Sequence, residues 1–460
     1  MQVREAARRE SLATESLFAI MLAATYLCAE FAWDLLGGQP YLGRAVIAVA
    51  SAILAWIVVA ATIPGWPAAR RLLLCLAVCA ALDIVTQVRV YENMSRFAAV
   101  HTGSDDFFYL KSGSQFAALL GDASTLEAYA GVYASLPYTP HIGFIVLLGH
   151  LFSLVPADDL SQWRAVALLN LFVLQWLAAL VVRLGSFAPR QLGLVLLLLL
   201  LPGFDLFYFA AGGLKDPAIV LLLVMLTAYL LDLGGKRITV RRLAAMGLIA
   251  TALFFLRNFY VVLPPLALLL TYLRARQGRP LRRIAVRVAT LLGLAAAVSL
   301  ITDSMWFQQV SLEGTWSRKI AESGWGAQIY NVPVAGPVIY ALITPLPPRL
   351  SELATGTVWT DFMRSVGTAA ILILLAVQAA AAVRTRAMSD KRWRTFLHVG
   401  ALVFVLSAYG SLEARHRLAS LPCIVICYGI ALRRTAVAPC SRRIPLFEPC
   451  APTRPAVPCP

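Results

Sequence analysis

Residues 365–383 read SVGTAAILILLAVQAAAAV, a stretch without a single charged residue. A helix of about 20 mostly apolar residues crosses a hydrocarbon core of about 30 Å. Comparable stretches recur along the chain, at 17–36, 45–63, 72–90, 164–182, 192–211, 216–232, 286–302, 396–411 and 418–432. The pattern predicts an all-α polytopic membrane protein with roughly 11–13 transmembrane helices.

The composition agrees with this fold class. Of the 460 residues, 60% are hydrophobic and only 14% are charged, whereas soluble domains carry about 25% charged residues. The first apolar run follows Arg4, Arg8 and Arg9 and lacks a small-residue cleavage site, so we expect it to remain as a span. We therefore expect residues 1–434 to form one transmembrane domain, without a separate soluble domain.

The net charge of +16 is concentrated in short loops at 236–242, 274–287 and 384–394 and in the tail. Lys and Arg beside spans mark the cytoplasmic side, and they contact anionic membrane lipids. The charge therefore indicates topology rather than binding of nucleic acid. The proline-rich residues 435–460 are expected to form a disordered cytoplasmic tail.

Two loops have a different charge balance. Residues 91–137 hold five acids against two bases, and residues 303–364 hold five acids against four bases. We expect 91–137 to be the first large periplasmic loop and 303–364 a second periplasmic region of a bacterial inner-membrane protein. Counting spans back from the tail places 413–417 on the same outer face.

Two segments do not fit simple spans. Counting spans from the N-terminus places Lys215 inside, whereas counting back from the basic loop 236–242 places it outside. One of the segments 138–155, 164–182 and 192–211 is therefore expected to be re-entrant or interfacial, and we expect it to be the short segment 138–155. Residues 243–273 lie between two basic loops, which predicts two half-length helices that meet at Arg257-Asn258 and Pro264-Pro265. Broken helices at membrane depth are tolerated where they line a cavity enclosed by protein.

Ionisable residues near membrane depth are costly and are functional candidates for that reason. The first group is His101-Thr-Gly-Ser-Asp105-Asp106-Phe-Phe-Tyr109. Of two adjacent carboxylates, one can take a proton from a hydroxyl while the other orients it. Alternatively, Asp105 or Ser104 caps a helix that begins near Phe107.

Three further groups carry charge. Lys215-Asp216 precedes Pro217, which is typical of a helix start, and the lysine could also hold a phosphate. Arg257 lies at the expected helix break, where we favour a function or a carboxylate partner over a side chain that only extends to the membrane interface. Residues 413–417 are either an interfacial turn or a phosphate seat in which Arg415, His416 and Arg417 supply the cations.

Cysteine indicates no chemistry. Cys75 and Cys79, and likewise Cys423 and Cys427, are spaced i,i+4 inside apolar stretches and are expected to be small buried hydrophobes. No Cys-x-x-Cys pair, nucleotide-binding loop or zinc-protease helix is present.

The order of these motifs resembles the GT-C membrane glycosyltransferases, which include protein O-mannosyltransferases and lipid A aminoarabinose transferases. Asp105-Asp106-x-x-Tyr109 looks like the acidic pair of their first large outer loop. The likeness continues through Tyr138-Thr-Pro140, Arg164, Asn170, Leu201-Pro202 and Gly213-x-Lys215-Asp216 and ends in Glu413-x-Arg415-His416-Arg417, similar to Glu-x-Arg-Tyr-Arg. It covers roughly residues 90–432.

This resemblance implies a GT-C-like fold with periplasmic interfacial helices and a polyprenyl-phosphate-linked sugar as donor. The acceptor is a glycan, lipid or protein hydroxyl on the periplasmic face, and transfer inverts the anomeric centre. Asp105 would be the general base beside Asp106. Substrate would be bound by His101, Tyr109, Lys215, Arg257, Arg415, His416 and Arg417. No cofactor or metal is implied, although a lipid pyrophosphate donor would make a divalent metal possible.

The chain also departs from the family pattern, because three spans instead of one precede the acidic loop and Lys-Asp replaces Ser-Glu at 215–216. Two other classes therefore stay open. One is an O-antigen or exopolysaccharide polymerase, with arginines that hold a lipid pyrophosphate. The other is a non-enzymatic transporter or flippase of lipid-linked sugars, which would show internal repeats and a path of midplane charges.

Overall fold

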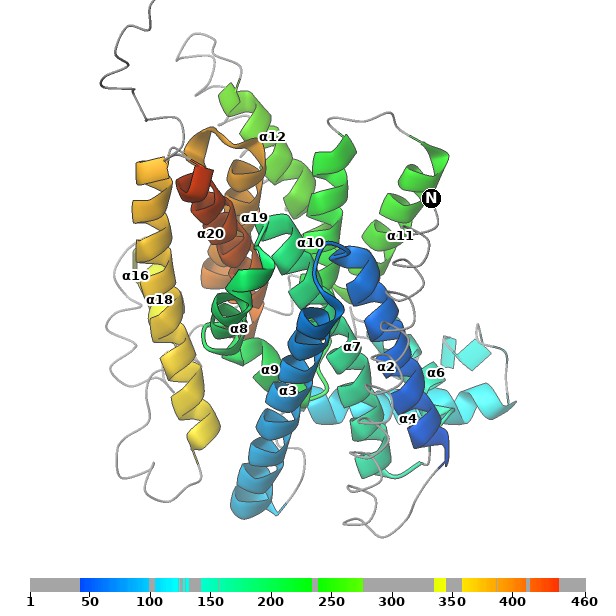
Figure 1. The fold of residues 1–460 in the computed structure, drawn as a ribbon. Coiled ribbons are helices and arrows are strands. Elements are labelled where there is room, and N and C mark those ends of the chain that lie inside the picture. The colour runs from blue at the N-terminus through cyan, green and yellow to red at the C-terminus, as the bar shows by residue number, and fades with distance from the viewer. Residues whose placement is uncertain are drawn as a thin grey trace, which may run out of the picture.

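The computed structural model describes residues 42–98, 104–122, 142–155, 157–233, 239–275, 335–344, 358–385, 387–410 and 414–437, with a few positions between 124 and 131. Within these ranges the chain is helical and contains no strand (Figure 1). The predicted spans 17–36 and 286–302 and residues 438–460 of the predicted tail lie outside the described residues.

The described α-helices pack mostly side by side as a bundle (Figure 1). They are α2 (Leu42–Thr62), α3 (Ala68–Phe97), α4 (Ser104–Asp122), α6 (Ile142–Phe152), α7 (Asp159–Gly185), α8 (Leu192–Leu200), α9 (Phe204–Ala211), α10 (Asp216–Leu233), α11 (Val240–Leu256), α12 (Leu263–Ala275), α16 (Ala335–Ile343), α18 (Trp359–Thr385), α19 (Lys391–Gly410) and α20 (Ser420–Val437), with 3-10 turns η1 (Pro189–Gln191), η2 (Asn258–Val262), η3 (Ala387–Ser389) and η4 (Ala414–Ala419).

Three of the described helices are long and apolar enough to cross a membrane: Ala68–Arg96, Ser161–Gly185 and Trp359–Thr385. A fourth span results if Pro189–Leu200 and Phe204–Ala211, which are bent by 61° at their junction, count as one. The helical membrane class predicted from the sequence therefore holds, while the larger number of spans stays a prediction.

The helix described within 138–155 is too short to cross a membrane. Its helix α6 has 11 residues, about 16 Å or half a hydrocarbon core. Figure 1 shows α4 lying across the long helices at one end of the bundle, where α6 packs against it. A Cβ added at Gly113 of α4 would lie 2.8 Å from the Cβ of Leu148, so the two helices pack closely because of this glycine.

Two apolar segments, 243–273 and 192–211, are broken helices. Arg257, between α11 and η2, has an extended backbone (φ −165°, ψ 96°), which confirms the break predicted at Arg257-Asn258. The predicted span 192–211 is also interrupted, because Leu201, Pro202 and Gly203 separate α8 from α9. A proline inside a helix removes a backbone donor and clashes with the preceding turn, which explains this second break.

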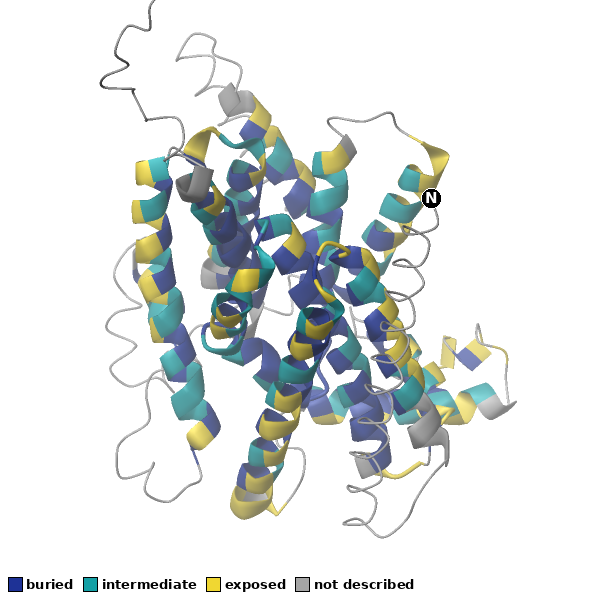
Figure 2. Cartoon of the chain, viewed as in Figure 1, coloured by how far each residue is buried: buried dark blue, intermediate teal, exposed yellow. Residues whose placement is uncertain are grey.

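Helix α7 forms the centre of the core. It packs against α2, α3, α10 and α20. In its most apolar stretch of 18 residues, 78% of the residues are buried (Figure 2). Its polar side chains bond internally; the Gln175 amide, for example, lies 3.1 Å from Cys79 Sγ. Cys75, Cys79, Cys423 and Cys427 are free and buried, as predicted.

The two ends of the bundle collect different loops. At the end opposite α4, Arg434 at the end of α20 pairs with Asp390 at 3.2 Å, and Arg433 reaches Ser186 at the end of α7. The basic segment 384–394 and the start of the tail thus lie together. Lys215 instead lies over the ring of Tyr109 in α4, at the other end of the bundle. This position agrees with the span count back from the basic loop 236–242, which places Lys215 on the side opposite that loop.

The arrangement predicts opposite labelling of two exposed positions. In a chain with its eight cysteines replaced, Lys111→Cys in α4 should react with an impermeant maleimide from outside the inner membrane. Met388→Cys in η3 should react only after the membrane is opened. The readout is labelling of intact and permeabilised spheroplasts, and labelling of both positions from the same side would contradict the topology.

Candidate functional site

Buried charges gather where α3, α4, α9 and α18 meet. Asp106, in the first turn of α4, is 2% exposed, and its Oδ2 accepts a hydrogen bond from Arg89 Nη2 at 2.9 Å. Arg89 Nη1 donates to the carbonyl of Tyr208 in α9 at 2.8 Å. The guanidinium of Arg89 therefore joins the crosswise helix α4 to the broken helix α9.

The ring of Tyr208 lies between two arginines. Arg89 Cζ lies 4.5 Å from the ring centroid, and Arg364 Cζ of α18 lies 4.4 Å from it. Arg364 Nε donates to Asp205 Oδ1 at 2.8 Å. An aromatic face attracts cations, most strongly where water is excluded, so Tyr208 can hold two like charges near each other.

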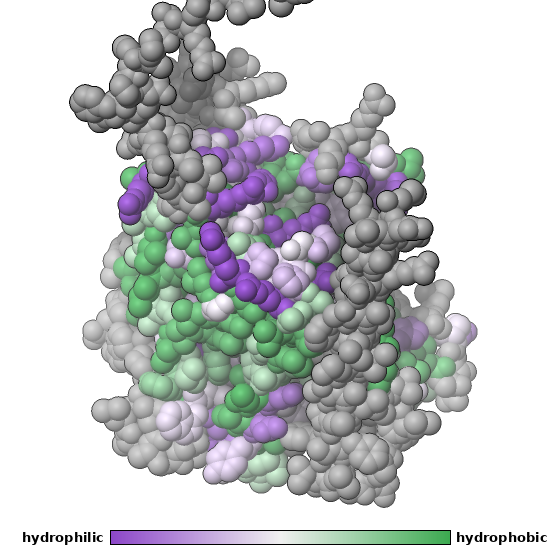
Figure 3. Space-filling model, viewed as in Figure 1, coloured by the Kyte–Doolittle hydropathy of each residue, from purple (hydrophilic) through white to green (hydrophobic). Residues whose placement is uncertain are grey.

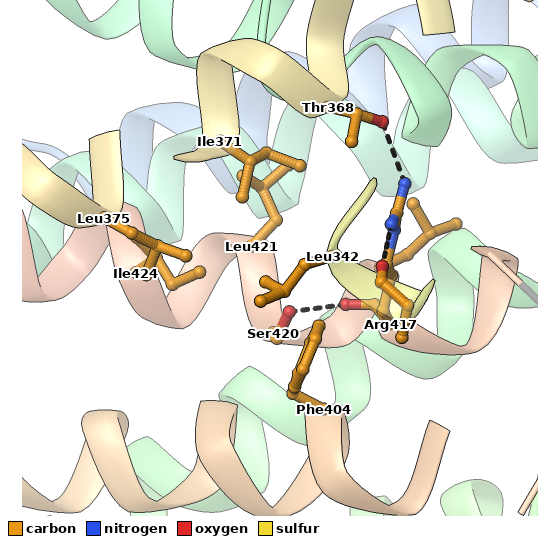
Figure 4. A pocket seen from close by; sticks show the side chains of 11 residues that line it. Leu342, Thr368, Ile371, Leu375, Phe404, Arg417, Ser420, Leu421 and Ile424 are labelled. Atoms are coloured by element: carbon orange, nitrogen blue, oxygen red, sulfur yellow. Dashed lines mark hydrogen bonds between the residues drawn. The ribbon is translucent and has the colours of Figure 1, made fainter. Parts of the chain in front are cut away.

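Asp205 extends this network to the C-terminal motif. Its Oδ2 lies 3.7 Å from Arg417 Nη2, the same atom that donates to Thr368 Oγ1 at 2.9 Å. Arg417 Nη1 donates to the carbonyl of Ala341 (Figure 4). We call Asp106, Arg89, Tyr208, Arg364, Asp205 and Arg417 the arginine network. It connects five elements of the chain: α3, α4, α9, α18 and η4.

A second cluster begins one turn further along α4. Tyr109 is buried, and Lys215 Nζ lies 5.1 Å from its ring centroid. Asp216 Oδ1, next in the chain, lies 3.9 Å from Arg257 Nη1. Arg257 also lies 5.6 Å from the ring of Tyr260. We call these five residues the lysine cluster, and helix α4 connects it to the arginine network.

A glycine turn positions Lys215 and Asp216. Gly213 has φ +70°, and the Gly213 and Leu214 amides donate to the carbonyls of Ala210 and Phe209. These two bonds form a Schellman motif, in which the helix ends at a residue in the left-handed conformation. Only glycine adopts that conformation easily. Asn170 of α7 donates to the carbonyls of Ala210 and Leu214, which fixes the turn from outside.

The structure unites most of the predicted candidates. Asp106, Tyr109, Lys215, Arg257 and Arg417 are buried and belong to the two clusters. Asp216 supplies the carboxylate partner that Arg257 was expected to need, and α10 begins at Asp216 with Pro217 in its first turn, as predicted.

Asp105 is half-buried in the first turn of α4. The alternative in which Asp105 caps a helix that begins near Phe107 is wrong, because α4 already begins at Ser104. His101 and Glu413 lie outside the described residues. Arg415 and His416 belong to the turn η4, but their side chains lie outside the described part.

Four members of the arginine network were not singled out by the sequence: Arg89, Asp205, Tyr208 and Arg364. Arg89 and Asp205 lie inside the apolar stretches 72–90 and 192–211. The signal that selected Arg257, an ionisable residue at membrane depth, applies equally to these two residues. Arg364 lies at the edge of its apolar stretch, and Tyr208 carries no charge signal, so only the fold identifies them.

Among the described residues, the two clusters hold four buried cations (Arg89, Lys215, Arg257 and Arg417) against three buried carboxylates (Asp106, Asp205 and Asp216). Arg364 adds a half-buried cation, Asp105 is a half-buried carboxylate beside Asp106, and Asp361, at the edge of the arginine network, is 40% exposed. Burying cations requires compensating negative charge, so the site suits an anionic ligand. Within the described part, no three His, Cys, Asp or Glu side chains are grouped to hold a metal ion.

Comparisons of the chain with protein-family models, curated proteins and solved structures found no match.

Gly212 provides a test of the Arg89–Asp106 pair. A Cβ at this position would lie 2.0 Å from Arg89 Nη1, so Gly212→Ala should force the guanidinium out of its pair. Disrupting one side of a buried ion pair costs roughly 3 kcal/mol. We expect a clearly lower thermal unfolding temperature of the detergent-solubilised protein.

Gly247→Ala is the matched control, because a Cβ there meets nothing within 4 Å on an exposed face of α11. It should leave stability unchanged or raise it by up to about 1 kcal/mol. Equal unfolding temperatures for the two variants would show that the Arg89–Asp106 pair does not need the space at Gly212.

Proposed function

We propose that the chain is an integral-membrane glycosyltransferase that moves a sugar from a polyprenyl-phosphate donor to an acceptor hydroxyl, with inversion. The observation that carries this proposal is the start of α4. Its first turn brings Asp105 and Asp106 to one end of an apolar bundle, next to five cations. A carboxylate for deprotonation and cations for a phosphate leaving group are what such a transfer requires.

The two carboxylates differ in their surroundings. Asp106 is 2% exposed and bound to Arg89, so its role is to hold that guanidinium and to fix the first turn of α4. Asp105 is half-buried and therefore accessible from the surface of the bundle. This difference supports Asp105 as the general base and Asp106 as a positioning residue.

The leaving phosphate is assigned to the lysine cluster. Lys215 and Arg257 lie beside Tyr109, one turn from the acidic pair on α4. Arg417 already donates to Thr368 and Ala341, so it contributes positive charge and holds α16 and α18 in place. Preorganised donors of this kind typically contribute about 2–4 kcal/mol to transition-state stabilisation.

The proposed reaction is one displacement. Asp105 takes the proton of the acceptor hydroxyl, whose oxygen forms a bond to the anomeric carbon from the face opposite the phosphate. The bond from this carbon to the phosphate oxygen breaks, and polyprenyl phosphate leaves with its new charge beside Lys215 and Arg257. A lipid-phosphate donor implies no metal. The acceptor is proposed to be a glycan, lipid or protein at the periplasmic face of the bacterial inner membrane.

Asp105→Asn tests the base. Asn keeps the shape of Asp and is equally tolerated near a helix start, but it cannot take the proton. General-base catalysis typically contributes 10²–10⁴-fold. We expect a loss of transfer of that size with normal expression and unfolding temperature, measured as release of polyprenyl phosphate from a radiolabelled donor.

Asp106→Asn is the matched comparison. It should lower the unfolding temperature, because it leaves Arg89 buried without its carboxylate, and it should reduce transfer less than Asp105→Asn. Full activity in Asp105→Asn with loss of activity in a stably folded Asp106→Asn would assign the base to Asp106. Full activity in both variants would overturn the proposed chemistry.

A lipid-linked-sugar transporter is the second candidate. The helix breaks between α8 and α9 and between α11 and α12 favour it, since transporters often bind substrate where helices are interrupted. Purified protein in liposomes separates the two functions. Movement of intact lipid-linked sugar between leaflets without release of polyprenyl phosphate would support transport. Release of polyprenyl pyrophosphate from a lipid-pyrophosphate donor would instead indicate a polymerase.

A further inference from the structure

One face of α3 is exposed along the whole length of the helix (Figure 2). Leu73, Ala80, Gln87 and Met94 recur every seven residues, and all four are exposed. A seven-residue repeat keeps one stripe of a helix facing a partner helix, as in coiled coils and in most packed transmembrane pairs. The stripe therefore has the periodicity of a helix–helix contact.

The stripe is polar at its centre. Asp83 lies next to Leu82, the midpoint of the span Ala68–Arg96, and it is exposed, as is Gln87 one turn further. Among the described residues, no side chain pairs with Asp83. A carboxyl group in hydrocarbon is costly, and intramembrane acids generally face a polar partner. An exposed Asp at mid-span therefore indicates a contact that the described part of the chain does not supply.

Helix α18 shows what a lipid-facing surface looks like in this protein. Its exposed residues through the middle of the span are all apolar: Ala369, Leu372, Ile373, Ala376, Val377, Ala379 and Ala380. The exposed face of α3 differs from it at Asp83 and Gln87. The comparison separates a surface selected only for contact with lipid from one that carries hydrogen-bonding groups.

We propose that this face of α3 packs against α3 of a second copy of the chain, as a parallel pair in which each Asp83 accepts a hydrogen bond from Gln87 of the other copy. Two copies inserted in the same orientation are related by an axis along the membrane normal, so their α3 helices run parallel. Asp83 and Gln87 then occupy neighbouring layers of the seam, and acceptor and donor match reciprocally.

Self-complementarity favours a second copy over a different protein. The stripe contains its own acceptor, its own donor and a small residue, Ala80, directly beside them. Small residues let helix backbones approach closely in a membrane, and interhelical hydrogen bonds then add to the packing. The inward face of α3 carries Arg89 and Glu92, which are already engaged with Asp106 and Thr360. Dimerisation through the outward face thus leaves the candidate site intact.

Dimerisation can be measured by single-molecule photobleaching of labelled protein in liposomes over a range of protein-to-lipid ratios. Asp83→Leu and Ala80→Ile should each raise the dimer dissociation constant roughly tenfold, because two reciprocal hydrogen bonds or the close approach are lost. Neither variant should lower the unfolding temperature, since both residues are exposed. Asp83→Asn, which can still accept a hydrogen bond, should retain most of the dimer.

Ala376→Ile on α18 is the matched control, because it makes the same change on an exposed, wholly apolar face. It should leave the dissociation constant unchanged. A photocrosslinking amino acid at Ile84 should give an adduct of twice the 49.9 kDa chain mass. The proposal would be overturned by a wild-type protein that stays monomeric at every ratio, by a dimer unaffected by the α3 variants, or by adducts of another mass.

Discussion

The ion pair between Arg89 and Asp106 is the contact on which the rest of the site depends. Both side chains are buried at one end of an apolar bundle, where neither charge is stable alone. Arg89 comes from the longest described helix, α3, and Asp106 from the helix α4 that lies across the bundle. The ion pair holds the first turn of α4 against α3. Because Asp105 lies in the same turn, the pair also positions the acidic residues at this end of the bundle.

The pair also determines what surrounds it. Arg89 has room only because Gly212 lacks a Cβ, and the adjacent Gly213 ends α9 in the turn that delivers Lys215 and Asp216. On its other side, Arg89 shares the ring of Tyr208 with Arg364, whose carboxylate partner Asp205 also approaches Arg417. The glycine turn between α9 and α10, after Ala211, therefore serves both the arginine network and the lysine cluster.

The surface of the bundle carries both apolar and polar side chains, and on the face shown in Figure 3 apolar side chains lie over α18. The outward faces of α18 and of α2 are apolar, as contact with lipid requires. Buried polar side chains such as Arg89, Asn170 and Gln175 are directed inward, where side chains or backbone carbonyls bond to them. Asp83 and Gln87 on α3 instead face outward at mid-span. The same helix thus carries a charge for the candidate site on one face and hydrogen-bonding groups for a partner on the other.

The sequence by itself determined the helical membrane class, the short segment near α6, the break at Arg257 and the burial of four cysteines. Each of these follows from local properties, such as the length of an apolar run or an arginine between half-spans. It also identified Asp106, Tyr109, Lys215, Arg257 and Arg417 as candidates.

Only the tertiary structure decided which charged side chains form pairs. Arg89 pairs across 17 positions and Arg364 across 159, and such pairings depend on how helices pack, which no local pattern encodes. The bend within 192–211 and the different exposure of Asp105 and Asp106 arise in the same way, because neighbouring helices decide which side of each residue is covered.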